Sequence, residues 1–311
     1  MIPPKNLKSS AGFVCKLVAE SKMPRNQVAA ASGLTNTYIR DLEQGNIANV
    51  GREKLIQFAV ALNLNLASID ELLRVFDRAN LSEDDIPLFL EAGIKRKTTT
   101  AIFPLRDFYA YELAVYSQEC IPGDQVMVND RPTVCLRQPG HRTFTERRLV
   151  EAHPIYEKLL ETIGAERRKR LEENLGKFQV THYICRQCLE DYVLNSGNAE
   201  ENRWRKRHVR NLITCMDRYP KLTVHLTGVC AYTLFSIKKP RDGSKVQVNF
   251  CARPGHFVAG ERPGRLSGFF TINPMILQTF QEELRSIKGW VLEEYADRRD
   301  LMEYLDKLIS G

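Results

Sequence analysis

The 311-residue chain has no long hydrophobic run, which excludes a membrane-spanning helix, because such a helix needs roughly 18–20 consecutive apolar residues. Its first apolar run, AGFVCKLVA, is interrupted by Lys16, so the pattern of a secretory signal peptide is missing. Eight cysteines are scattered over the whole length and do not form the compact framework of a disulfide-rich secreted domain. We therefore expect a cytoplasmic protein with reduced thiols.

The common catalytic and nucleotide-binding signatures are also missing. The chain contains no GxxxxGK[ST] phosphate loop, no GxGxxG dinucleotide fingerprint, no GxSxG elbow and no HExxH zinc-protease motif. From these absences we expect a protein that is not an enzyme.

Composition places few further limits on function. Hydrophobic residues make up 43% and charged residues 27% of the chain, as in ordinary globular proteins, and the length allows two domains. The net charge of +7 favours polyanionic partners only slightly, because many basic proteins bind no nucleic acid.

The most informative stretch is residues 25–45, RNQVAAASGLTNTYIRDLEQG. It predicts two short helices joined by a tight turn at Gly33, where a residue that tolerates positive φ is favoured. Thr35 can cap the second helix by accepting from its free N–H groups. Ile39 and Leu42 then face inward at helical spacing. The polar residues left outside would form the reading face of a DNA-binding helix-turn-helix.

Apolar residues on both sides of this stretch supply the bundle that such a motif needs. Residues 8–21 carry an apolar face at helical spacing before it, and residues 55–73 carry two further helical patterns after it. Ser68 followed by Glu71 predicts a capping box at the start of the last helix. The sequence thus predicts a compact all-α domain of five helices over residues 1–73.

Residues 11–73 resemble the lambda-repressor/Cro-like helix-turn-helix family, often called XRE-type. The matching positions are Ala29, Gly33, Thr35, Ile39, Glu43 and Gly45, followed by the segment LIQFAVALNLNLASIDELL. Members of the family often carry Gln at the start of the first motif helix, where it braces a phosphate contact, whereas Arg25 stands there in this chain. The resemblance implies a homodimer that binds double-stranded DNA, with residues 36–44 as the recognition helix.

The resemblance also implies which side chains touch DNA. Asn36, Thr37 and Arg40 would read base edges, since Asn pairs well with adenine and Arg with guanine in the major groove. Phosphates would be contacted from helix ends and the following loop by Arg25, Thr35, Gln44, Asn46 and Asn49. Thr35 is better explained as the N-cap of the second helix than as a residue that contacts DNA. Glu43 is expected to brace the domain internally, because phosphates repel a carboxylate.

The rest of the chain divides into a connector and a larger region. Residues 74–100 predict a helical arm followed by a polar hinge, KRKTTT, at 95–100. Over residues 101–311 strand patterns alternate with helical ones, which predicts a mixed α/β or α+β sheet domain with a helical C-terminal tail at 273–310. Strands are predicted at 124–129, 177–185, 221–228, 232–239, 245–251 and 265–272. No dimer seam is evident in the first domain, so we assign dimerisation to the sheet domain.

Cys185-x-x-Cys188, with His182 three residues before it, is half of a zinc site. A structural zinc ion needs four ligands, and the sequence contains no second CxxC or HxxxH. Distant ligands would have to come from Cys215, Cys230, Cys251, His225 or His256. If the two cysteines share a helix face with Leu189 and Tyr192, burial in the core explains them. We expect core packing and no cofactor, with zinc as the alternative.

The loop ARPGHFVAGERPGRLSG concentrates basic residues between two predicted strands. Arg253, His256, Arg262 and Arg265 are candidates for binding a small anionic effector, although a plain strand connection explains the loop equally. The order of strands, with SGFFTINPMILQTFQEELRSI after the loop, faintly resembles the effector-sensing halves of some bacterial regulators, including some with a phospholipase-D-like sheet. The nuclease form of that fold carries HxK, which none of the six histidines supplies.

Together these patterns predict a bacterial or phage transcriptional regulator. The helix-turn-helix would bind an operator as a dimer, and the C-terminal domain would dimerise and sense a signal. Two alternatives stay open: an enzyme tethered to DNA, with residues 101–311 catalytic, or a C-terminal interaction module without a ligand.

Overall fold

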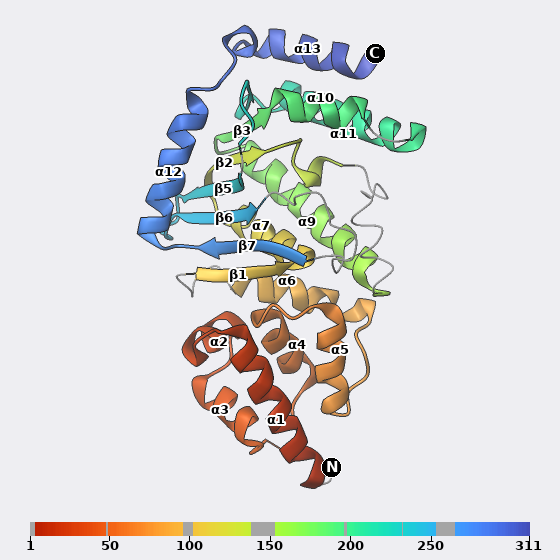
Figure 1. The fold of residues 1–311 in the computed structure, drawn as a ribbon, viewed down its shortest axis with the longest axis vertical. Helices are drawn as coiled ribbons and strands as arrows, with labels where there is room; N and C mark the ends of the chain where they lie inside the picture. The colour runs from red at the N-terminus through yellow and green to blue at the C-terminus, as the bar shows by residue number, and fades with distance from the viewer. Residues whose placement is uncertain are drawn as a thin grey trace.

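The computed structural model describes residues 4–47, 49–95, 102–137, 153–195, 198–231, 233–252 and 265–311. A helical bundle forms the N-terminal end, a seven-stranded mixed sheet lies in the middle, and a helical layer lies at the C-terminal end (Figure 1). The architecture is therefore mixed α and β, as predicted. No helix among the described residues is long and apolar enough to cross a membrane.

The predicted five helices are present in the N-terminal bundle. They are α1 (Pro4–Ser21), α2 (Arg25–Ser32), α3 (Asn36–Gln44), α4 (Arg52–Ala61) and α5 (Leu66–Val75). Every residue of α4 from 55 to 61 is buried. A helix buried all round needs neighbours on every side, and α4 contacts α2 and α5 of the bundle and also α6 (Ile86–Lys95) beyond it.

The capping box predicted at the start of α5 is wrong. Helix α5 begins at Leu66, and its N-cap is Asn65, whose Oδ1 accepts from the backbone N–H of Ser68 at 2.8 Å. Ser68 is thus the third helical residue and does not cap the helix. Asn is at least as good an N-cap as Ser, and the earlier start carries Leu66 into the core, where it is buried.

The sheet has the strand order β1-β7-β6-β5-β2-β3-β4. Its strands are β1 (Ile102–Asp107), β2 (Gly123–Asn129), β3 (Val180–Cys185), β4 (Leu222–Thr227), β5 (Thr233–Pro240), β6 (Gln247–Ala252) and β7 (Arg265–Thr271). Neighbours β2, β3 and β4 pair in parallel, and every other pair is antiparallel. All six predicted strands are present. Strand β1 was not predicted; it contains Pro104 and lies at the sheet edge, where a proline is tolerated.

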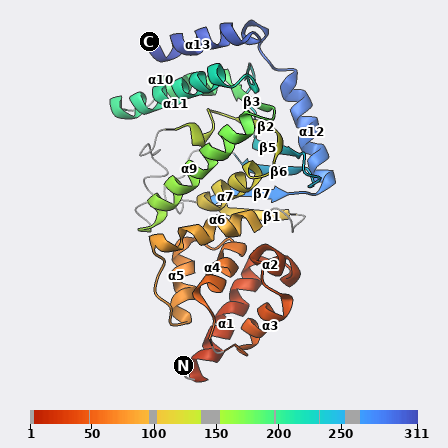
Figure 2. The ribbon, with the colours of Figure 1, turned by 180° about the vertical axis from the view of Figure 1, so that it is seen from behind.

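Helices cover both faces of the sheet (Figure 2). Connections between β1, β2, β3 and β4 contain α7 (Phe108–Glu119), α9 (Tyr156–Leu175), α10 (Arg186–Leu194) and α11 (Ala199–Arg218). These four helices lie on one face, whereas α12 (Pro274–Lys288) packs its apolar side on the other face. Helix α13 (Arg298–Ser310) packs on α10 and α11. Short 3-10 turns occur at Glu83–Asp85, Val134–Leu136 and Glu293–Tyr295.

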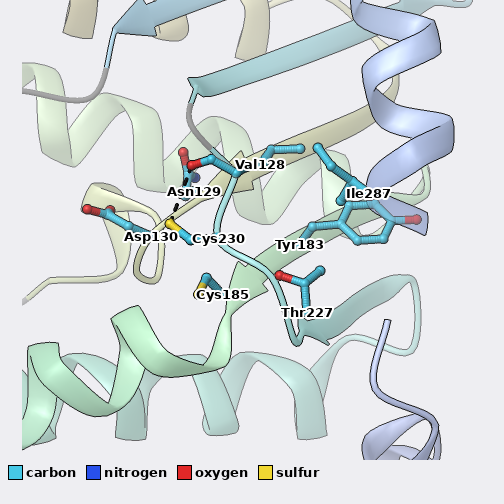
Figure 3. Close-up of a pocket in the computed structure, with 9 residues that line it drawn as sticks. Val128, Asn129, Asp130, Tyr183, Cys185, Thr227, Cys230 and Ile287 are labelled. Atoms are coloured by element: carbon cyan, nitrogen blue, oxygen red, sulfur yellow. Dashed lines mark hydrogen bonds between the residues drawn. The ribbon is translucent and has the colours of Figure 1, made fainter. Parts of the chain in front are cut away.

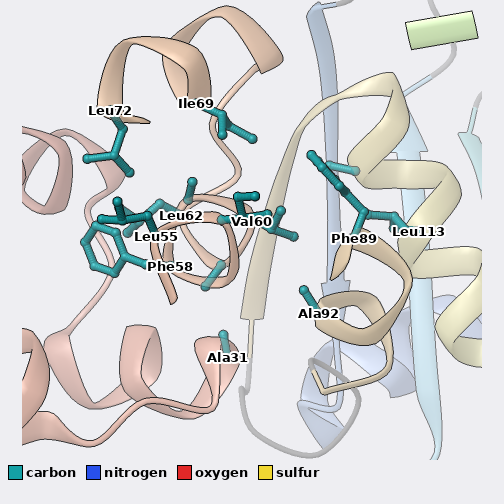
Figure 4. Close-up of a cluster of buried hydrophobic side chains, with 14 of the residues drawn as sticks. Ala31, Leu55, Phe58, Val60, Leu62, Ile69, Leu72, Phe89, Ala92 and Leu113 are labelled. Carbon is teal, nitrogen blue, oxygen red and sulfur yellow. The ribbon is translucent and has the colours of Figure 1, made fainter. Parts of the chain in front are cut away.

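The connector between the two regions is part of the core. Its predicted helix is present as α6, but it is not a free arm, because it packs against α4 on one side and α7 on the other. Figure 4 shows Phe89 and Ala92 of α6 between Val60 of α4 and Leu113 of α7, and all four side chains are buried. The ring of Phe89 also meets that of Tyr109 edge-on, with 5.7 Å between the ring centroids. The predicted hinge begins at Lys95, which the structure places as the last residue of α6, and residues 96–100 lie outside the described residues.

Hydrogen bonds also fasten the bundle to the sheet region. The side-chain amide of Asn63 donates to the carbonyl of Pro104 in β1, and the hydroxyl of Tyr109 donates to the carbonyl of Leu64. One cluster of buried apolar residues runs without interruption from α1 through α6 and α7 to α9. The bundle and the sheet region therefore share a core.

Candidate nucleic-acid interface and cysteine cluster

The predicted helix-turn-helix corresponds to α2, a three-residue turn and α3. Gly33 ends α2 in the left-handed region, with φ 70°. Thr35 Oγ1 accepts from the backbone N–H of Tyr38 at 3.1 Å, which confirms Thr35 as the cap of α3. Ile39 and Leu42 are buried. Helix α3 is thus held by its inner face, and its orientation is fixed.

The outer face of α3 carries the residues predicted to read DNA. Asn36, Thr37, Arg40 and Gln44 are exposed, and at 3.6 residues per turn they lie on one side of the helix, within about 100° of arc. The Arg40 side chain is 54% exposed, and its Nε lies 4.0 Å from Asp41 Oδ1. Exposed ion pairs of this length contribute little, so Arg40 can exchange this contact for a ligand.

Arg25 braces the two helices of the motif. Its Nε donates to Glu43 Oε2 at 2.7 Å, and its Nη2 lies 2.6 Å from the same oxygen. The pair joins the start of α2 to the end of α3, which confirms the expected internal role of Glu43. Because the Arg25 side chain is still 49% exposed, its remaining N–H groups can donate outward.

The remaining predicted phosphate contacts are exposed and form hydrogen bonds within the bundle. Asn46 Nδ2 donates to Gln44 Oε1 at 3.0 Å, and Asn49 Oδ1 accepts from the guanidinium of Arg78. Both interactions use the amide oxygen of Gln44 or Asn49. Their NH2 groups can therefore still donate to an anion.

The predicted effector residues fall largely outside the described part of the chain. Arg253, His256 and Arg262 are not among the described residues, and only the backbone of Arg265 is described, at the start of β7. No site is assigned to them.

Three cysteines meet at the carboxyl ends of the parallel strands. Figure 3 shows two of them, Cys185 and Cys230. Cys185 ends β3, Cys188 lies in the first turn of α10, and Cys230 lies between β4 and β5. Their three sulfur atoms lie within 4.8 Å of one another, and the sulfurs of Cys188 and Cys230 are 3.3 Å apart. The expectation that both cysteines of the CxxC pair lie on one helix face is therefore wrong, because Cys185 belongs to the strand.

His182 does not join this cluster. Residues three apart in a strand point to opposite faces, so His182 and Cys185 of β3 diverge. His182 is buried with its Nε2 at 3.0 Å from Asn129 Nδ2, and burial lowers its pKa to about 4. Of the distant ligands considered, the structure brings only Cys230 into the group among the described residues.

A pocket opens beside the cysteines. It is lined by residues at the ends of β2, β3 and β4 and by neighbouring segments, namely Val128, Asn129, Asp130, Tyr183, Cys185, Thr227, Cys230, Ala231 and Ile287 (Figure 3). In open sheets with parallel strands, ligands bind in the crevice outside the carboxyl ends of those strands. Topology therefore favours this end of the sheet for a ligand.

A layer of polar side chains is buried between α7, α9 and the sheet. Arg167 of α9 donates from Nε and Nη2 to Glu119 at 2.9 Å each, and from Nη1 to Glu112. Lys238 of β5 is fully buried, and its Nζ has no hydrogen-bond partner among the described residues. Burial lowers the pKa of Lys238 to about 8. Two carboxylates and two cations balance the formal charge of this layer.

The sequence does not reveal this polar layer. In the segment YTLFSIKK, Ser236 and Lys238 alternate with apolar residues and look like the solvent-facing side of a strand. In the structure that side faces α7, where Ser236 Oγ donates to Gln118 Oε1 at 2.6 Å. Only the strand pairing, which brings β5 to the middle of the sheet, shows that both faces are covered.

Comparison of the chain with family models, with curated proteins and with solved structures finds no match.

Proposed function

We propose that this protein is a sequence-specific DNA-binding transcriptional regulator, similar to the lambda-repressor/Cro-like family, that binds an operator as a dimer. One observation carries the proposal. Asn36, Thr37, Arg40 and Gln44 form an exposed polar row on α3, while the opposite side of that helix is buried in the bundle. An exposed polar row on the second helix of a helix-turn-helix is the arrangement that enters a major groove.

Reading of bases would fall to the N-terminal half of α3. Arg40 has the geometry to donate two hydrogen bonds to guanine, and Asn36 can pair with adenine. Each such pair discriminates against a wrong base by about 1–3 kcal/mol. Thr37, between them on the same face, can contact a thymine methyl group.

Phosphate contacts would supply most of the affinity and make it dependent on salt. Arg25, Asn46 and Asn49 lie exposed at the ends of the motif helices and in the loop that follows. The Arg25 pair also neutralises Glu43, which removes a repulsive carboxylate charge from the side of the bundle that faces DNA.

The sheet region would supply dimerisation and sensing. Its faint resemblance to effector-sensing domains of bacterial regulators supports a sensing role, and the carboxyl ends of the parallel strands are the end of the sheet where an effector would bind. Because the bundle shares its core with the sheet region, the dimer contact would set the separation of the two recognition helices, about 34–36 Å for successive major grooves.

Selection of bound sequences from a random DNA library by the purified full-length protein tests the proposal. We expect one enriched, two-fold symmetric site. Arg40→Ala should weaken binding to that site by 1–3 kcal/mol, which is roughly 5–150-fold, and remove the preference for one base in each half-site.

Arg74→Ala is the matched control, because Arg74 is an exposed arginine of the same bundle that lies on α5. It should leave the base preference unchanged. A library that yields no enriched sequence, or an Arg40→Ala protein with unaltered preference, would show that α3 does not read DNA. Sedimentation at micromolar concentration tests the dimer separately, and a monomer there would contradict it.

A further inference from the structure

We propose that Cys185, Cys188 and Cys230 form a zinc site with three thiolate ligands and a solvent molecule in the fourth position. The site is independent of the DNA-reading face. It lies at the carboxyl ends of β3 and β4, beside the pocket described above.

The distances fit a zinc ion after small side-chain movements. A zinc–sulfur bond of about 2.3 Å in a tetrahedral site places the sulfur atoms roughly 3.8 Å apart. The three sulfurs already lie within 4.8 Å of one another, and one pair is at 3.3 Å. Rotation about the cysteine side-chain bonds can supply the remaining adjustment without moving the backbone.

The cluster joins two segments that are distant in the chain, the β3–α10 junction with Cys185 and Cys188 and the β4–β5 connection with Cys230, which distinguishes it from ordinary core packing. Cys185 is buried at the end of a strand, whereas Cys188 and Cys230 are only half-buried. A cysteine that serves only as a small apolar residue is generally among the most buried in a protein. Two half-buried thiols that converge with a third, beside a pocket that two of the three line, are better explained by a shared ligand.

Burial and the neighbouring cysteines raise the pKa of the Cys185 thiol to about 12, so the bound metal ion itself would displace the proton. Cys185 is the residue before the first turn of α10, and Cys188 lies within that turn. Helix N-termini carry a partial positive charge, and they stabilise a thiolate placed against them. Asp130, which also lines the pocket, is balanced by Arg131, with the Arg131 Nε at 3.1 Å from the carboxylate. A soft thiolate set of this kind selects zinc over magnesium or calcium.

The fourth position would face the pocket. Cys185 and Cys230 both line it, and Asn129 and Thr227 lie on its wall (Figure 3). Zinc held by three protein ligands with solvent in the fourth position can exchange that solvent for another ligand. A zinc ion here would therefore be accessible from the pocket.

The metal content of the purified full-length protein, measured by elemental mass spectrometry after growth with zinc, tests the proposal. We expect one zinc per chain, and its loss in Cys185→Ser, Cys188→Ser and Cys230→Ser proteins. Cys215→Ser is the matched control, since Cys215 is also half-buried but lies outside the cluster; it should retain zinc. Arg40→Ala should retain zinc as well, which separates this site from the DNA-reading face.

A second measurement does not depend on variants that could fail to fold. Cobalt(II) added to metal-free wild-type protein should give the intense visible bands of tetrahedral coordination and the charge-transfer absorption of cobalt–thiolate bonds, both abolished by zinc. Wild-type protein with no zinc and no such bands would overturn the proposal. So would zinc that survives all three substitutions, or a Cys188–Cys230 disulfide in the protein as purified.

Discussion

The shared core predicts that the N-terminal bundle and the sheet region unfold together. Phe58 of α4 is fully buried within the bundle, far along the chain from any strand. Phe58→Ala removes its ring and leaves a cavity, which costs about 3–5 kcal/mol. A chain of this length loses about 2 °C in Tm for each kcal/mol, so we expect Tm to fall by roughly 6–10 °C.

Tryptophan fluorescence can show whether that loss reaches the sheet region. The two tryptophans of the chain are Trp204 in α11 and Trp290 after α12, so the bundle itself contributes no tryptophan signal. If the core is shared, the fluorescence transition of the Phe58→Ala protein should coincide with the helical circular-dichroism transition, and both should shift equally.

Leu305→Ala is the control from the opposite end of the molecule, because Leu305 is fully buried in α13. It should lower both transitions together, by the about 2–5 kcal/mol typical of such a truncation. A fluorescence transition that stays at its wild-type temperature in the Phe58→Ala protein, with an earlier circular-dichroism step, would refute the shared core.

Three buried charges give further predictions, each measured by urea unfolding. Burial raises the pKa of Asp107 to about 6. The free energy of unfolding of the wild type therefore falls as pH rises from about 4 to 6, because the buried carboxyl loses its proton over that range. Asp107→Asn should be more stable than wild type at pH 7 by on the order of 2–3 kcal/mol, with no gain at pH 3.5. A gain that is the same at both pH values would contradict this. Burial lowers the pKa of Lys238 to about 8. The destabilisation caused by burying its charged ammonium is therefore fully present below about pH 8 and fades towards pH 10.5. Lys238→Met should be more stable than wild type at pH 7 and approach wild type near pH 10. A less stable variant at pH 7 would instead indicate a stabilising partner for this ammonium. Arg167→Met leaves Glu112 and Glu119 buried without their cation and should cost about 3–5 kcal/mol at pH 7, and a neutral effect would contradict the pairing.

The parts predicted correctly from the sequence are those that depend on neighbouring residues. The turn at Gly33, the cap at Thr35 and the buried pair Ile39 and Leu42 are all set within ten positions of one another, by backbone conformation and helical spacing. The six predicted strands were recognisable for the same reason, since alternation is a local property.

The parts that were missed depend on which distant segments meet. Cys230 could only be named as one of several remote candidates, because parallel pairing of β3 with β4 decides that it meets Cys185. The role of α6 depends on its packing between α4 and α7. The apolar pattern of α6 alone does not distinguish a free helical arm from a helix buried between two others. The buried Lys238 was missed for the same reason, since the coverage of both sheet faces follows from topology.

Helix α6 also determines how this protein can change over generations. In proteins whose N-terminal domain is joined by a free linker, recombination can exchange that domain for another, because few contacts between the two parts are lost when the chain is cut in the linker. Here a cut after residue 73 would strip α6 from α4 and expose an apolar surface that includes Val60. Each substitution at Phe89 or Ala92 must suit two neighbours at once. The bundle and the sheet region must therefore be inherited as one piece, whereas substitutions on the exposed row of α3 leave that piece undisturbed.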